Sequence, residues 1–513
     1  MNETIVKHLN FGEDAKDAIF KGVEKLTNAV SSTLGASGKC VIMEDSNGDP
    51  QITKDGVTVA NSIVLLDPVE NMGAKLIKEA ARKTVKEAGD GTTTATVLAH
   101  AILEESYKAA DKMSPREVKE GINTAVNKVV QYLDQISKKI EGDNIKQVAT
   151  ISANNDPELG ALIAKAFEEV GKDGLVTMEV WDEPSTTLEV INGVEYDEGY
   201  ENQNFITNKT TREAELNDCL VLIVDSPIEN IRKIQNVLEY VITEKRQLLI
   251  VADVEPQVSS ALAMNKLKGN IKVNVIKAPT YGVNKKALLE DLATLTGARV
   301  ISEEMGDDLD LINVEHLGEC KKAISTFGKT VIQIESKNEE TISLIAKLQE
   351  EYEKSKAGIL KDSLEKRLSR LKGKVSIIKV GANSEVELKE KKDRVEDAIC
   401  ATKAAIKEGI VPGGGIALLN ASQKVKFKTL GEEALLKAIT KPYEVILKNA
   451  GIEIIDIHSA KGKGLNVVTG KTVDMVKSGI IDPLLVTKSA LKNAASVATT
   501  ILSTNCVINN LRA

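Results

Sequence analysis

One segment of the sequence combines glycines, an aspartate and a run of threonines, residue types that suit the binding of a phosphate group. It runs from Ala88 to Thr96 and reads AGDGTTTAT. Glycines let the backbone approach a ligand closely, and the free N–H groups at the start of a helix bind phosphate oxygens. Asp90 could hold the magnesium ion that accompanies a nucleotide. The alternative is a threonine-capped helix after a tight turn, with no ligand.

A second segment, ITKDGVT at residues 52–58, places a cation and a carboxylate together at a turn. The apolar spacing predicts a short strand over residues 52–59. Lys54 could stabilise the negative charge of a phosphate group, and Asp55 could orient a water molecule. An ordinary hairpin turn explains the same residues, because Asp-Gly is a common pair in such turns.

A third segment, VPGGGI at residues 411–416, has three consecutive glycines before an expected helix. A backbone of this kind lets a ring or a phosphate lie flat against it. A flexible linker is the alternative. The apolar flanks and the helix that follows argue against a plain linker.

A fourth segment, DRVEDAI at residues 393–399, falls within a long helix predicted from Glu385 to Glu408. Asp397 lies off the apolar stripe of this helix, in line with Ala401 and Ala404. It therefore projects from a face of small side chains that can approach another surface. A solvated carboxylate is the alternative, and these residues alone favour it.

The composition indicates a globular protein with several domains. The chain has 513 residues, and 42% of them are hydrophobic and 28% charged. At about 150 residues per domain, this length suggests about three domains. The formal net charge of -8 argues against a nucleic-acid partner. No apolar run suits a membrane span or a secretion signal, so we expect a cytoplasmic protein that binds no membrane.

The cysteines and histidines suggest neither a disulfide framework nor a metal site. The five cysteines lie far apart in the sequence and form no Cys-x-x-Cys pair: Cys40, Cys219, Cys320, Cys400 and Cys506. This pattern is typical of free thiols in a reducing compartment, where they serve as small buried apolar residues. The four histidines show no ligand spacing, so we expect no zinc.

The two ends of the chain have the same predicted secondary-structure pattern, and the middle of the chain has a different one. The first 135 residues and the last hundred are mostly helical in pattern, whereas residues 192–335 alternate short apolar strands with helices. Residues 220–224 and 248–252 are continuous apolar runs, which are typical of parallel strands buried on both faces. A chain that starts in one domain, leaves it and returns would look like this.

The order of the motifs resembles one known family, the group I chaperonins or GroEL family. The motifs are KDG, GDGTTTATVLA, ISANN, KAP-x-x-G, TLTG, KVGA, RVEDA, GGG and DP-x-x-VT-x-SA. The resemblance extends from about Asn10 to about Val507, and the KDG, GDGTTTATVLA and RVEDA elements in this order make it highly specific. Group II chaperonins vary the KDG element. The sequence thus resembles a group I chaperonin, and a divergent or phage-encoded member would fit.

The resemblance implies an α/β multidomain chaperonin fold. A mainly helical equatorial domain would comprise residues 1–136 and 409–513. A small hinge-like intermediate domain would comprise 137–191 and 375–408, and an α/β apical domain 192–374.

The resemblance also implies an ATP-dependent molecular chaperone. Family members form homo-oligomeric rings, commonly of seven subunits, which capture non-native proteins and enclose them under a small GroES-like lid. ATP binding and hydrolysis drive this cycle, so the chain would be an ATPase. A passive holdase or a structural ring with a narrowed client range is the alternative.

The family's site residues map onto this chain by their motifs. ATP would contact Thr33, Leu34, Gly35, Lys54, Asp90, Gly91, Thr92, Thr93, Thr94, Gly414, Gly415, Asn466, Val467 and Asp482. Asp90 would bind Mg2+, whereas Thr33, Lys54 and Thr93 would bind K+. Asp397 and Asp55 would be the catalytic pair that orients the attacking water. The family's usual proline after Gly35 is Ala36 here.

The groove for clients and lid would lie between two apical helices, at about residues 230–245 and 257–268. Its apolar contact residues would be Tyr200, Phe205, Ile234, Leu238, Leu262 and Met264. The family usually has larger apolar side chains at the positions of Glu201, Asn204, Gln235, Ser259 and Ala263. Since apolar burial drives such contacts, we expect weaker client capture.

Overall fold

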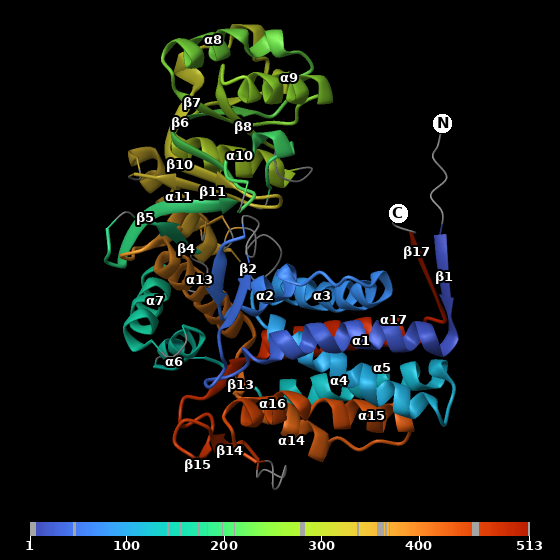
Figure 1. Ribbon diagram of the computed structural model, residues 1–513. Coiled ribbons are helices and arrows are strands. Elements are labelled where there is room, and N and C mark those ends of the chain that lie inside the picture. The colour runs from blue at the N-terminus through green and yellow to red at the C-terminus, as the bar shows by residue number, and fades with distance from the viewer. Residues whose placement is uncertain are drawn as a thin grey trace. The chain divides into compact units, whose positions relative to one another are not determined.

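A computed structural model of the chain divides into two compact units (Figure 1). Unit 1 comprises Met1–Ala164, Val180–Ser185 and Val380–Ala513, and unit 2 comprises Lys165–Glu179 and Thr186–Lys379. The structure describes residues 7–44, 48–140, 143–153, 156–171, 175–181, 183–196, 198–209, 211–277, 283–335, 338–355, 364, 367–368, 370–453 and 461–510. Both ends of the chain belong to unit 1, as the sequence pattern suggests. The three-domain division remains a prediction.

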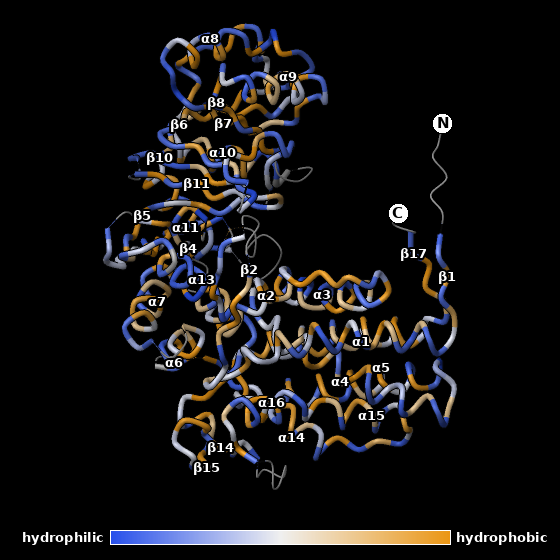
Figure 2. Tube along the Cα trace, viewed as in Figure 1, coloured by the Kyte–Doolittle hydropathy of each residue, from blue (hydrophilic) through white to orange (hydrophobic). Residues whose placement is uncertain are grey.

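The core of unit 1 is a layered bundle of helices. Its main members are α1 (Gly12–Ser31), α3 (Pro68–Ala88), α4 (Thr92–Ala110), α5 (Pro115–Ile136), α15 (Leu430–Ala438) and α17 (Leu484–Leu502). Figure 2 shows apolar residues recurring along these helices. Their side chains, at helical spacing, bury a common face. In α1 the buried residues are Ala15, Ile19, Val23, Leu26 and Val30. Gly22 and Gly73 let α1 and α3 approach closely, because a Cβ atom at either would meet the other helix's backbone within 2.2 Å.

The remaining elements of unit 1 include those that surround the site described below. The helices are α2 (Gly56–Ser62), α6 (Asp143–Ser152), α13 (Glu385–Glu408), α14 (Ile416–Lys424) and α16 (Lys441–Asn449). Antiparallel pairs join β1 (Lys7–Phe11) to β17 (Cys506–Asn510), β2 (Val41–Glu44) to β3 (Pro50–Thr53), β13 (Ile410–Pro412) to β16 (Ile481–Pro483), and β14 (Lys463–Asn466) to β15 (Lys471–Asp474). Helix α7 (Pro157–Val170) contributes residues to both units.

The strand predicted over residues 52–59 is wrong beyond its first two residues. Strand β3 ends at Thr53, and helix α2 begins at Gly56. The Asp55 carboxylate accepts hydrogen bonds from the backbone N–H groups of Val57 and Thr58, so it caps a helix. The Asp-Gly pair therefore starts a helix and does not form a hairpin turn.

Unit 2 is built on a nine-stranded mixed sheet in the order β4-β12-β5-β11-β10-β6-β7-β8, with β9 paired to β6. The strands are β4 (Leu175–Val180), β5 (Thr187–Tyr196), β6 (Ala214–Val224), β7 (Gln247–Val251), β8 (Lys272–Ile276), β9 (Val300–Ile301), β10 (Gly318–Ser325), β11 (Thr330–Ile334) and β12 (Lys374–Val380). Strands β6, β7 and β8 run parallel, which confirms the prediction from the two continuous apolar runs.

Helices cover both faces of this sheet (Figure 1). Helices α8 (Gln235–Thr243) and α9 (Pro256–Leu267) pack on one face, and α10 (Val283–Thr296) and α11 (Glu339–Lys354) on the other. Along β6 the side chains alternate between these cores, so Leu222 faces one and Cys219 and Val221 the other. No helix in the described part of the chain has the length and apolar character needed to span a bilayer.

Candidate functional site

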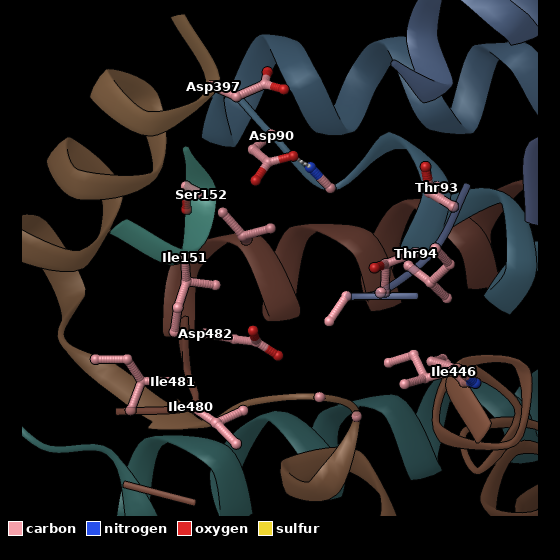
Figure 3. Close-up of a pocket in the computed structure, with 18 of the residues that line it drawn as sticks. Asp90, Thr93, Thr94, Ile151, Ser152, Asp397, Ile446, Ile480, Ile481 and Asp482 are labelled. Atoms are coloured by element: carbon pink, nitrogen blue, oxygen red, sulfur yellow. Dashed lines mark hydrogen bonds between the residues drawn. The ribbon is translucent and has the colours of Figure 1, made fainter. Parts of the chain in front are cut away.

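Unit 1 contains a cavity of about 990 Å³ lined by residues from both ends of the chain (Figure 3). Every residue predicted from the sequence for ATP contact or catalysis lies in its wall. They are Thr33, Leu34, Gly35, Lys54, Asp55, Asp90, Gly91, Thr92, Thr93, Thr94, Asp397, Gly414, Gly415, Asn466, Val467 and Asp482. The cavity is at the upper end of the size range of small-molecule sites.

The N-terminus of α4 opens onto this cavity. Gly91 is its N-cap, in the left-handed region at a φ of 95°, and no side chain caps the helix. The first intrahelical bond runs from the Ala95 N–H to the Gly91 carbonyl at 2.9 Å, so the N–H groups of Thr92, Thr93 and Thr94 have no acceptor within the helix. The first turn carries no acidic residue. This arrangement suits an anion such as phosphate.

The loop before α2 brings a second charged group to the same wall. The Asp55 carboxylate accepts from Val57 N at 3.0 Å and Thr58 N at 2.7 Å, which fixes its orientation. The Thr93 hydroxyl lies against Gly56, where a Cβ atom would come within 2.2 Å of it. The same hydroxyl is 3.5 Å from the Thr33 hydroxyl. Two of the three residues predicted to bind K+, Thr33 and Thr93, are therefore neighbours in space.

The three-glycine segment is held in place by Asp482. Strand β13 pairs with β16 so that Val411 lies opposite Asp482. The backbone N–H groups of Gly414 and Gly415 donate to the Asp482 carboxyl group. Burial raises the pKa of Asp482 to about 7, and the Asp90 charge contributes to the rise. The carboxyl group thus fixes the tight turn that leads into α14.

Helix α13 carries Asp397 into the cavity, close to Asp90 (Figure 3). Burial raises the pKa of Asp397 well above its usual range, and the charges of Asp90 and Asp55 raise it further. Burial also raises the pKa of Asp90, with a further contribution from Asp55. Asp393, one turn before Asp397, has its pKa raised to about 6, mainly by burial and next by Asp55.

This excess of carboxylates fits the binding of a cation together with phosphates. Within the described residues no three His, Cys, Asp or Glu side chains gather as a metal cage. Magnesium in nucleotide sites needs no cage, because one or two carboxylates, phosphate oxygens and water complete its shell. Asp90, beside the α4 N-terminus, would be its protein ligand. The cation would offset the repulsion between carboxylates, which adds to the effect of burial on these pKa values.

The structure adds site residues that the sequence reasoning missed. Helix α6 contributes Gln147, Ile151 and Ser152 to the cavity wall, and α13 contributes Asp393 and Arg394. The ISANN motif, which contains Ile151 and Ser152, is the sequence signal that could have found part of this set. Further apolar wall residues, such as Ile446, Met475 and Ile480, lie in segments with no distinctive motif.

Most residues of the predicted client groove in unit 2 lie in the core of the described structure, so the groove remains a prediction. Phe205, Ile234 and Leu262 are at most 1% exposed and Tyr200 is 7% exposed. These four pack with the sheet beneath α8 and α9. Leu238 is partly buried, and Met264 is 53% exposed.

Some of the residues predicted to weaken client capture lie in the core, and the others lie at or near the surface. Ser259 and Ala263 are buried on α9, so they cannot alter a surface contact directly. Asn204 and Gln235 are exposed, and Glu201 is half-buried. The exposed apolar side chains on these helices are Ile242, Met264 and Leu267. The most exposed apolar surface on α8 and α9 is therefore built from these three residues.

Comparison with known proteins identifies the family to which the chain belongs. The sequence matches the TCP-1/cpn60 chaperonin family over residues 26–512. The chain therefore belongs to the TCP-1/cpn60 chaperonin family, and its fold is the multidomain α/β chaperonin fold.

Two solved structures of a phage chaperonin are similar to the chain along its length. They are crystal forms II and I of the chaperonin gp146 from bacteriophage EL 2 (Pseudomonas aeruginosa), both determined in the presence of ATP-BeFx. Form II is 22% identical, covers 100% of both chains and gives a TM-score of 0.73. Form I is 22% identical, covers 98% of this chain and 99% of gp146, and gives a TM-score of 0.66.

Proposed function

We propose that this protein is an ATP-hydrolysing chaperonin subunit that assembles into a homo-oligomeric ring and assists the folding of other proteins. The observation that carries the proposal is the cavity in unit 1. It brings an uncapped helix N-terminus, the half-buried Asp90 and the Asp397 carboxyl group of another helix together in one cavity. These are the groups that phosphoryl transfer to water requires, namely phosphate binding, charge neutralisation and positioning of the nucleophile.

The cavity residues have distinct roles in ATP hydrolysis. The N–H groups of Thr92, Thr93 and Thr94 bind phosphate oxygens, and Asp90 holds the cation. Asp397 and Asp55 orient the attacking water, and a carboxylate oxygen of Asp397 accepts its proton. The raised pKa of Asp397 makes this carboxylate a stronger base. When bound, Mg2+-ATP supplies the phosphoanhydride bond that is cleaved.

The rest of the cavity holds the nucleoside and a monovalent cation. Gly414 and Gly415, fixed by Asp482, provide a flat backbone for the sugar and base, with Asn466 and Val467 beside them. The hydroxyls of Thr33 and Thr93, with Lys54 nearby, form the proposed K+ site. The structure of the phage chaperonin gp146 obtained in the presence of ATP-BeFx supports the proposal of nucleotide binding.

The wider cycle follows from membership of the family. Non-native proteins are the proposed clients, a small GroES-like protein the proposed lid, and the cytoplasm the proposed location. Ring assembly, commonly with seven subunits in the family, would enclose a client. A passive holdase or a structural ring remains the second candidate, because Asn204 and Gln235 make the exposed part of the predicted groove polar.

Steady-state ATP hydrolysis by the purified protein tests the proposal. We expect Mg2+-dependent turnover that falls by about 100-fold or more in Asp397→Asn, because a positioned general base contributes that much. ATP affinity, measured by calorimetry, should change little. Glu396→Gln is the matched control, since Glu396 is exposed on the same helix. Binding of non-native protein without any ATP turnover would favour the holdase.

A further inference from the structure

Two cysteines that are 101 residues apart in the sequence lie against each other in unit 2. Cys219 on β6 and Cys320 on β10 are direct partners in the antiparallel register. Their Sγ atoms are 2.8 Å apart, and neither residue is bonded to another cysteine. The sequence alone predicts scattered free thiols, and only strand pairing reveals this dithiol.

The geometry of the pair suits a covalent bond. Directly opposite residues in an antiparallel pair have Cα atoms about 4.5–5.5 Å apart. This separation lies within the range that disulfides span, about 4.4–6.8 Å. The sheet already holds both backbones in place, so the bond can form without a large movement of either strand.

The surroundings explain why the dithiol stays reduced under reducing conditions. Cys219 is 0% and Cys320 4% exposed, within the core between the sheet and helices α10 and α11. The neighbouring thiol and burial both raise the pKa of Cys320, which keeps it protonated at neutral pH. Since the thiolate is the reactive form, attack on an oxidant must await opening of the structure.

Arg246 bridges strands β6 and β10 beside the dithiol by contacting a residue on each strand. Its Nε atom donates to the Asp218 carbonyl oxygen at 3.3 Å, and its Nη2 atom contacts Glu319 Oε1 at 3.0 Å. Asp218 and Glu319 directly precede the two cysteines. Asp218 also has a φ of 44°, in the left-handed region that residues other than glycine seldom adopt. The backbone next to Cys219 is therefore strained, and Arg246 contacts it from near the surface.

We propose that Cys219 and Cys320 form a redox-active dithiol that low-molecular-weight disulfides convert to a cross-strand disulfide. One cysteine thiolate attacks a sulfur of glutathione disulfide, which forms a mixed disulfide and releases one glutathione thiolate. The second cysteine thiolate then attacks the protein sulfur of the mixed disulfide and releases the other glutathione. The dithiol loses two electrons and its two protons, and one glutathione disulfide becomes two glutathiones.

A disulfide bond between Cys219 and Cys320 would enclose the parallel part of the sheet within one covalent loop. The chain between the two cysteines contains β7, β8 and β9 with helices α8, α9 and α10. Closing this long loop restricts the unfolded chain and so stabilises unit 2 against unfolding. Oxidising conditions would therefore stabilise the unit that carries the predicted client surface. The inference depends on strand pairing and is independent of ATP hydrolysis.

Equilibration of the full-length protein in glutathione redox buffers tests the inference. After acid quenching and alkylation, digestion without reduction should yield the peptides of Cys219 and Cys320 joined to each other. A variant with Cys40, Cys400 and Cys506 replaced by serine should lose both of its thiols and two hydrogens of mass. In the same buffers Cys320→Ser should give at most a glutathione adduct on Cys219.

The rate of oxidation provides a second readout. Arg246→Ala should speed disulfide formation several-fold, because it removes the contact that bridges the strands. Arg299→Ala is the matched control, since Arg299 pairs with Asp307 elsewhere in unit 2. Recovery of Cys219 and Cys320 only as separate alkylated or glutathione-bound peptides, in both the unmodified chain and Arg246→Ala, would overturn the proposal.

Discussion

Gly89 lies directly against Cys400, since a Cβ atom at Gly89 would come within 2.4 Å of the Cys400 Cβ atom. Gly89 ends α3 in the left-handed region at a φ of 76° and immediately precedes Asp90. Cys400 lies on α13, one turn beyond Asp397. The contact therefore sets how closely the helix of the proposed base approaches the proposed metal ligand.

Gly89→Ala should lower both stability and turnover. The left-handed conformation costs a residue with a Cβ about 1–2 kcal/mol, and the collision with Cys400 pushes α13 away from Asp90. We expect ATP turnover to fall at saturating ATP, which steady-state kinetics measures. Gly451→Ala is the control, because Gly451 has a φ of 70° and nothing within 4 Å of an added Cβ. Equal effects of the two substitutions would argue against the positioning role.

The stability of the protein should depend on pH through Asp393. Its pKa is raised from 3.8 to about 6, so the folded state binds the proton more tightly than the unfolded state. The stabilisation is complete below about pH 4, is lost as the pH rises to about 6, and stays lost above that. Asp393→Asn should therefore raise the free energy of unfolding at pH 8 by about 1 kcal/mol, after allowance for solvent screening.

Urea unfolding of both proteins at pH 5 and pH 8 measures this effect. The difference in free energy of unfolding between the two proteins should be larger at pH 8, because Asp393 is charged in the folded wild-type protein at that pH. Asp482, with a pKa of about 7, titrates in both proteins and cancels in the comparison. A difference that is the same at both pH values would contradict the assignment.

Two substitutions on α9 should distinguish a side chain that stabilises the core of unit 2 from one that lies on its surface. Leu262 is 1% exposed, so Leu262→Ala should cost about 2–5 kcal/mol of stability. Met264 is 53% exposed, so Met264→Ala should change stability by less than about 0.5 kcal/mol. If clients bind here, Met264→Ala should weaken binding of a non-native protein, which light scattering during client aggregation reports. A stable Leu262→Ala variant with impaired capture would restore Leu262 to the contact surface.

The hydroxyl pair of Thr33 and Thr93 should make hydrolysis sensitive to potassium. Replacing K+ with choline should lower turnover of the wild-type protein, because the proposed site loses its cation. Thr33→Val should need more K+ for half-maximal activity, since the hydroxyl 3.5 Å from Thr93 is removed. Thr96→Val is an isosteric control, because the Thr96 hydroxyl is buried and bonds the Thr92 carbonyl. A K+ response unaltered by Thr33→Val would place the cation elsewhere.

The cavity residues could be predicted from the sequence because their motifs are local. Glycine runs, a helix start rich in threonine and a Lys-Asp pair specify backbone shapes that form within a few residues. The groove residues could not be predicted in this way. An apolar residue on α8 or α9 faces either the sheet or the solvent, and only packing on β6, β7 and β8 decides which.

The sequence by itself determined the family resemblance, the helical pattern of the two ends, the buried parallel strands and the motif residues of the cavity wall. The tertiary structure decided relationships between distant segments. It showed that Asp482 fixes the glycine turn, that Gly89 contacts Cys400, and that Cys219 faces Cys320. The physical reason is that motifs and periodicity express local backbone preferences, whereas strand register and helix packing join residues hundreds of positions apart.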